Sequence, residues 1–93
     1  MLSTQQQQTI LAVLLPYNPV YVGVFGSYSR NQNRPDSDLD LLVDLNSEYD
    51  LFDLFDIKEA LSEKLGIRID LVTKQSLSVV LSTLIQKDLR QIN

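Results

Sequence analysis

The sequence predicts an α/β (α+β) fold, in which a small mixed sheet of three strands, or slightly more, carries helices packed on one face. Three apolar segments rich in strand-forming residues alternate with segments whose apolar residues recur at helical spacing. A full helical segment separates the second strand from the third, so these two should run parallel through a right-handed crossover. The first link is shorter and mostly loop, which favours an antiparallel pair. At 93 residues the chain fits one domain, residues 1–93.

The first predicted elements are a helix and a strand. Ser3 or Thr4 can cap a helix that begins in the glutamine run, and Pro16 lies where this helix should end. Residues 20–25, VYVGVF, are β-branched or aromatic around one glycine and predict the first strand. A glycine and a serine follow directly, where a short helical turn can begin, and then a polar loop with a proline.

The rest of the chain predicts a strand, a helix, a strand and a helix, in that order. Residues 39–45, LDLLVDL, alternate at the period of a strand with one buried face. Residues 51–65 carry an apolar stripe at helical spacing, and Gly66 stands at the C′ position of that helix. A third strand is predicted over residues 67–72 and a last helix over residues 76–89.

The composition excludes several classes of site. The chain has no cysteine and no histidine, which rules out disulfides, thiolate chemistry and the commonest zinc ligand. Any metal must be held by oxygen, which favours magnesium, manganese or calcium. The net charge is −4 without a basic stripe, so direct nucleic-acid binding is not expected. No apolar run could cross a membrane and no signal peptide is recognisable, so a cytoplasmic domain is expected.

Two aspartates, Asp38 and Asp40, lie two residues apart at the start of the second strand. Residues at this spacing point to one face of a strand, roughly 6.5–7 Å apart at their bases. Two carboxylates there repel each other unless a cation lies between them. Such a pair can span two metal ions that lie roughly 3.5–4 Å apart. The alternative, which a lone D-x-D motif favours, is the solvated face of an edge strand.

Gly26 and Ser27 follow the first strand directly, and this position suits a phosphate. Glycine lets the backbone approach a ligand, while the serine hydroxyl and the N–H groups of a following helical turn can donate to it. The alternative is an ordinary turn with a capping serine.

Asp70 stands inside the third predicted strand, although strand interiors are poor in aspartate. If the second and third strands are neighbours, Asp70 can face the two earlier aspartates. The alternative is an aspartate at a strand edge, paired with Arg68 or Lys74.

Together these segments resemble the signature of the DNA polymerase β-type nucleotidyltransferase superfamily, and in particular its smallest branch, the minimal nucleotidyltransferases (MNT proteins). That motif reads G-S-x-A-R-G, a spacer and S-D-x-D, with a third aspartate on a later strand. Residues 26–30 (GSYSR), 37–43 (SDLDLLV) and 69–72 (IDLV) match in order and type, and the resemblance covers nearly the whole chain. Ser29 replaces the usual alanine. Asn31 replaces a glycine, and asparagine is the residue that best tolerates positive φ after glycine.

The resemblance implies a polymerase β-type fold and a metal-dependent nucleotidyltransferase. It assigns Asp38 and Asp40 to the binding of both metal ions, Mg²⁺ or Mn²⁺. It assigns Asp70 to helping bind one ion and activating the attacking hydroxyl. Gly26–Ser27 would hold the triphosphate of ATP or another NTP, and Arg30 would contact phosphate or brace the loop.

Members of this branch pair with HEPN-domain toxins as antitoxins, and some transfer AMP from ATP to a tyrosine hydroxyl of that partner. By resemblance, this chain is expected to modify a HEPN-type toxin within a hetero-oligomer. A second hypothesis is a binding module that masks its partner by contact without turnover. Nucleotide transfer to a small molecule is a weaker third possibility, because no acceptor domain is visible. Phe52 and Phe55 lie beside the apolar stripe of the helix over residues 51–65, as core residues or as an interface anchor.

Overall fold

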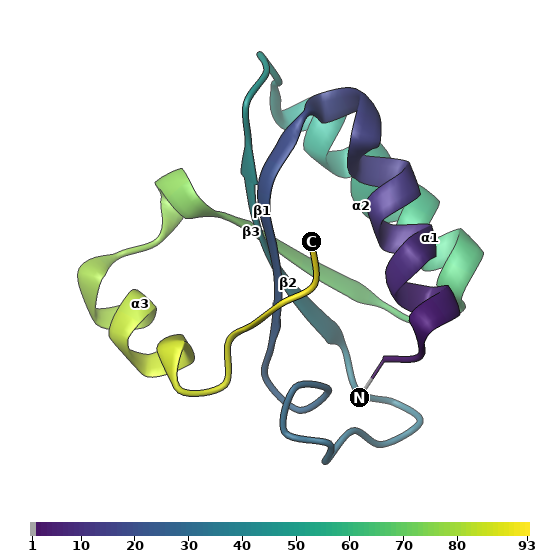
Figure 1. The fold of residues 1–93 in the computed structure, drawn as a ribbon, viewed down its shortest axis with the longest axis vertical. Coiled ribbons are helices and arrows are strands. Elements are labelled where there is room, and N and C mark those ends of the chain that lie inside the picture. The colour runs from purple at the N-terminus through teal and green to yellow at the C-terminus, as the bar shows by residue number, and fades with distance from the viewer. Residues whose placement is uncertain (1) are drawn as a thin grey trace.

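A computed structural model describes residues 2–93, which form one mixed sheet flanked by helices (Figure 1). The strand order is β3-β2-β1-β4. β2 pairs antiparallel with β1 and parallel with β3, as the sequence predicts, and β4 adds an antiparallel strand beside β1. In chain order the elements are α1 (Thr4–Leu14), the 3₁₀ turn η1 (Leu15–Tyr17), β1 (Pro19–Phe25), β2 (Leu39–Leu45), α2 (Leu51–Leu65), β3 (Ile69–Thr73), the 3₁₀ turn η2 (Lys74–Ser76), α3 (Val79–Gln86) and β4 (Arg90–Gln91).

Local sequence signals define the ends of the two long helices. Ser3 caps α1 in a reciprocal capping box with Gln6, and Asp50 and Asp53 form the same arrangement at the start of α2. Gly66 ends α2 with a φ of 68°, in the left-handed region that favours glycine. The predicted bounds of α2 are therefore confirmed. Among the helices of residues 2–93, none has the length and apolarity that a membrane span requires.

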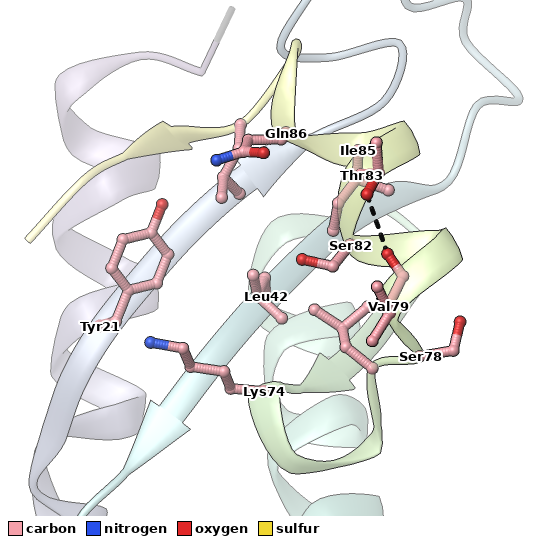
Figure 2. Close-up of a pocket in the computed structure, with 11 residues that line it drawn as sticks. Tyr21, Leu42, Lys74, Ser78, Val79, Ser82, Thr83, Ile85 and Gln86 are labelled. Atoms are coloured by element: carbon pink, nitrogen blue, oxygen red, sulfur yellow. Dashed lines mark hydrogen bonds between the residues drawn. The ribbon is translucent and has the colours of Figure 1, made fainter.

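Successive side chains of β2 point to opposite faces of the sheet: the closed face, which α1 and α2 cover, and the open face on the other side. Leu39, Leu41 and Val43 are fully buried in the core beneath α1 and α2, which pack against each other on this face (Figure 1). The expectation that helices cover one face holds for these two. α3 instead lies over the opposite face, where Leu42 of β2 and Ile85 of α3 line a pocket of about 470 Å³ (Figure 2).

The last helix and the strand before it differ from their predicted bounds. β3 begins at Ile69, two residues later than predicted, because the turn that follows Gly66 uses the residues between. α3 is shorter than predicted because a 3₁₀ turn follows β3, and Ser78 then caps the helix through the Leu81 N–H. Most of its apolar residues stay exposed. On the sheet face beneath α3, two aspartates of β2, Asp40 and Asp44, flank Leu42.

Candidate functional site

The open face of the sheet brings Asp40 and Asp70 together. β2 and β3 run parallel with these two residues as register partners. Their chain neighbours Leu39 and Ile69 are buried on the closed face, so both carboxylates lie on the open side. Asp40 is half-buried there and Asp70 is exposed. The two predicted aspartates on different strands therefore form one acidic pair.

Burial and neighbouring charges shift the pKa of Asp40. Its pKa is raised from 3.8 to about 6 by burial, by the charge of Asp70, by a hydrogen bond with Asp70 and by the charge of Asp38, while Arg30 lowers it. Burial and the neighbouring carboxylates favour the protonated form of Asp40 despite the charge of Arg30, and a bound cation would favour the ionised form instead. A divalent ion would thus relieve the repulsion between these carboxylates.

Asp38 lies just before β2 and is held by Arg68. The Arg68 Nε atom is 3.0 Å from Asp38 Oδ1, and Arg68 Nη2 also donates to the Asp36 carbonyl oxygen at 3.0 Å. Within residues 2–93, no three acidic side chains gather closely enough to form a ready-made metal site. The oxygen donors of Asp40 and Asp70 fit Mg²⁺ or Mn²⁺ chemically. Asp38 is instead paired with Arg68 in this structure.

Gly26 lies against the carboxylate of Asp40. Its φ is 74°, and a Cβ atom at this position would collide with the Asp40 carboxylate oxygen. A single helical turn follows, in which the Arg30 N–H donates to the Gly26 carbonyl at 3.1 Å and the Gln32 N–H donates to the Ser27 carbonyl at 2.9 Å. The predicted turn is therefore present, and it places Ser27 directly beside the glycine that touches the acidic pair.

Asn31 completes this turn in the left-handed region, with a φ of 60°. Its N–H donates to the Tyr28 carbonyl at 3.3 Å. A residue with positive φ is what the glycine of the MNT motif would supply here. The expectation that asparagine preserves the turn is confirmed.

Two consecutive residues of the turn contact Asp88, which follows α3. The Arg30 Nη1 atom lies 2.6 Å from Asp88 Oδ2. The Ser29 hydroxyl donates to the main-chain carbonyl of Asp88, and Ser29 is only 2% exposed. Arg30 is expected either to contact phosphate or to brace the loop, and its contact with Asp88 corresponds to the second role. The sequence places Ser29 within the motif but does not connect it with Asp88, because no local pattern links residues this far apart.

The first prediction concerns the charge of Asp40. Because its pKa is higher in the folded chain than its usual value of 3.8, the folded form holds the proton more strongly than the unfolded form does. This stabilisation is complete below pH 3.8 and is lost as the pH rises through about 6. Without metal, Asp40→Asn should therefore keep or raise the melting temperature at pH 7.

Thermal melts of both proteins between pH 4 and pH 8 would check this. The wild type should lose stability relative to the variant as the pH rises through this range. A sharp loss of stability in Asp40→Asn at every pH would mean that the carboxylate serves the fold rather than the site.

Comparison with known protein sequences identifies related chains. The family model described as nucleotidyltransferase domain matches residues 7–92. A protein adenylyltransferase, MntA, of Thermococcus cleftensis is 46% identical over 56 residues, which are 60% of this chain and 57% of that protein. A candidate protein adenylyltransferase of Methanocaldococcus jannaschii is 35% identical over 75 residues, 81% of each chain. The match thus spans less than two thirds of the Thermococcus protein.

Solved structures share the fold. A structure described as a candidate minimal nucleotidyltransferase has a TM-score of 0.81 and 34% identity, over 92% of this chain and 88% of that chain. A chain in a crystal structure of a toxin–antitoxin with AMP-PNP has a TM-score of 0.83 and 25% identity, over 94% of this chain and 72% of that chain. The predicted polymerase β-type fold is confirmed by these matches.

Proposed function

Because the chain belongs to the nucleotidyltransferase domain family, we propose that it is a metal-dependent nucleotidyltransferase. It transfers AMP from ATP to a hydroxyl group of a partner protein: the hydroxyl oxygen bonds to the α-phosphate, the bond from the α- to the β-phosphate breaks, and pyrophosphate leaves. The observation that carries this proposal is that Asp40 and Asp70 are register partners on parallel strands, with Gly26 lying against the Asp40 carboxylate. The relative named protein adenylyltransferase supports the reaction. The structural neighbour with AMP-PNP, an analogue of ATP, supports the nucleotide.

The acidic residues hold the metal in this proposal. Asp40 and Asp70 would hold Mg²⁺ or Mn²⁺, with Asp38 as a third ligand. When bound, the cation would supply positive charge for the phosphate and would lower the pKa of the attacking hydroxyl. Asp70 accepts the proton of that hydroxyl, because this chain contains no histidine to take it.

The turn after β1 receives the triphosphate. Gly26 lets the backbone approach the phosphates, and Ser27 donates its hydroxyl to them. The first N–H groups of a helical turn have no carbonyl partner within that turn, and they suit an anion. Arg30 supplies positive charge on the same side, since it lowers the pKa of Asp40.

The partner in this proposal is a HEPN-type toxin, with a tyrosine hydroxyl as the acceptor, and the chain acts as its antitoxin. Similarity to a chain in a toxin–antitoxin crystal structure supports a hetero-oligomer of this kind. The proposal takes the acceptor hydroxyl from a second protein, which could reach Asp70 because this residue is exposed on the open face of the sheet.

A binding module that neutralises the toxin by contact is the second candidate function. The observation that favours it is the Asp38–Arg68 ion pair, which occupies one of the three carboxylates assigned to metal. Incubating this protein and a HEPN toxin with labelled ATP and Mg²⁺ separates the two functions. Label that appears on a toxin tyrosine, and does not appear when a chelator is present during the incubation, supports the transferase. Neutralisation of the toxin without label would establish the binding module.

The second prediction concerns the surface that binds the partner. Phe52 and Phe55 at the start of α2 are 79% and 59% exposed, beside an exposed Leu51. The structure therefore favours the interface anchor over the core residue for both rings. Replacing both phenylalanines with serine should weaken toxin binding at least ~10-fold, because buried aromatic anchors dominate interface energies. Titration calorimetry would measure this, and the melting temperature should change little.

Val79→Ser provides the matched control. Val79 is 84% exposed on α3, which lies over the other face of the sheet. This change should leave toxin binding nearly unaltered. A larger loss of affinity with Val79→Ser than with the double phenylalanine change would place the interface on α3 instead.

A further inference from the structure

The nucleotide turn, residues 26–31, is tied to a distant part of the chain through one residue. Ser29 and Arg30 both contact Asp88, the first through the Asp88 main-chain carbonyl and the second through its carboxylate. The two contacts use different atoms of Asp88, so they hold both its backbone and its side chain. Ser29 is buried, which shields its hydrogen bond from water.

The segment that follows Asp88 is itself attached to the strand that leads into the turn. β4 pairs with β1 at Val24↔Arg90 and Gly23↔Gln91, and the Ile92 N–H donates to the Val22 carbonyl at 2.8 Å. The sheet thus fixes the position of Asp88 from one side. On the other side α3 ends at Gln86, and the Asp88 N–H donates to the Ile85 carbonyl at 3.1 Å. Asp88 is a fixed point rather than a free surface residue.

A displacement of Arg30 would be transmitted to the acidic pair through Gly26. The Arg30 N–H donates to the Gly26 carbonyl, and Gly26 lies against the Asp40 carboxylate. A Cβ atom on Gly26 would meet the Asp40 carboxylate oxygen, so the backbone at Gly26 lies close to that carboxylate. The position of Arg30 therefore helps to set the position of the backbone that faces Asp40.

We propose that Asp88 is a positioning residue for the nucleotide: through Ser29 and Arg30 it holds the turn over residues 26–31 in the shape that receives the phosphates. The inference rests on the proposed function for its nucleotide part alone. The mechanical part, that Asp88 orders the turn, stands independently of any reaction. Asp88 does not touch the reacting atoms, and its effect passes entirely through the turn.

Asp88→Asn separates the two contacts, because asparagine keeps the main-chain carbonyl that Ser29 uses and removes the carboxylate charge that Arg30 uses. Amide hydrogen exchange in the turn, measured without nucleotide, should become about tenfold faster while exchange in α1 and α2 is unchanged. The dissociation constant for ATP with Mg²⁺ should rise about tenfold. At saturating ATP, kcat should stay within about threefold of the wild type, because bound nucleotide orders the turn again.

Three variants complete the experiment. Asp88→Glu keeps the charge and should restore most of the ATP affinity. Ser29→Ala combined with Asp88→Asn removes both contacts and should loosen the turn further than either change alone. Glu59→Gln removes one negative charge from an exposed position on α2 and should change neither turn exchange nor ATP affinity.

Unchanged exchange in the turn of Asp88→Asn would overturn the proposal, as would faster exchange throughout the protein, which would indicate a general loss of stability. Faster exchange confined to the turn, with ATP affinity unaltered, would overturn the nucleotide part. A wild-type protein that binds no ATP would instead contradict the proposed function, while exchange in the turn would still test the brace.

Discussion

Asp70→Asn should slow nucleotide transfer at least ~100-fold while binding of the toxin and of ATP stays largely intact. Asparagine keeps the shape of the side chain but removes its charge and its basic oxygen. Asp70 is exposed on the open face beside Asp40, so an acceptor hydroxyl from a second protein can reach it. Loss of its charge also removes one cause of the raised pKa of Asp40, so the metal-free variant should not be less stable than the wild type. Single-turnover transfer of labelled AMP, with separate binding titrations, would measure these effects.

Asp44→Asn is the matched control for this prediction. Asp44 lies on the same strand and the same face as Asp40, but its register partner is Tyr21 of β1. It stands four residues from Asp40 along β2, away from the acidic pair, and the change should alter the transfer rate little. Equal transfer rates in Asp70→Asn and Asp44→Asn would show that Asp70 is not the third carboxylate, and the proposed mechanism would then be wrong.

Gly26→Ala should reduce kcat/KM for nucleotide transfer by at least ~100-fold, because it disturbs phosphate binding and the Asp40 carboxylate together. The new Cβ atom would collide with that carboxylate, and a φ of 74° is unfavourable for alanine. The backbone or Asp40 must move, and either movement separates the turn from the acidic pair. Transfer kinetics with a melting curve would show how much of the loss arises at the site.

Gly66→Ala distinguishes the collision from the backbone strain. Gly66 has a φ of 68°, close to that of Gly26, but a Cβ atom there would meet nothing within 4 Å. This variant should therefore lose about 1 kcal/mol of stability and keep its transfer activity. If Gly26→Ala behaves like Gly66→Ala in both measurements, Gly26 does not shape the site.

Local sequence patterns predicted much of the fold because they act over short distances. The bounds of β2 and α2 follow from alternation, a capping aspartate and a glycine in the left-handed region. The crossover between β2 and β3 correctly predicted a parallel pair, and this pairing is what aligns Asp40 with Asp70. The turn over residues 26–31 and the tolerance of Asn31 were also predictable, since both depend on the backbone preferences of single residues.

What the sequence could not predict depends on contacts between distant segments. β4 has two residues, too few for a recognisable pattern, and it exists because β1 has a free edge beside it. Arg68 was considered as a partner for Asp70, but it pairs with Asp38, because the loop before β2 runs beside the residue before β3. α3 leaves most of its apolar residues exposed, and the sequence could not predict this because it depends on how the helix packs against distant strands.

The contact between the nucleotide turn and Asp88 has a consequence for the order of events during synthesis. Arg30 and Asp88 are 58 residues apart, so their contact closes one of the longer loops in the chain. Closing a long loop costs chain entropy, so this contact is expected to form late in folding. β1, β2, α2 and β3 are complete by residue 73, before Asp88 leaves the ribosome. A nascent chain can therefore build the acidic pair while the turn beside it is still unbraced. The acidic pair and the brace on the turn beside it can thus form as two separate steps, with the brace second.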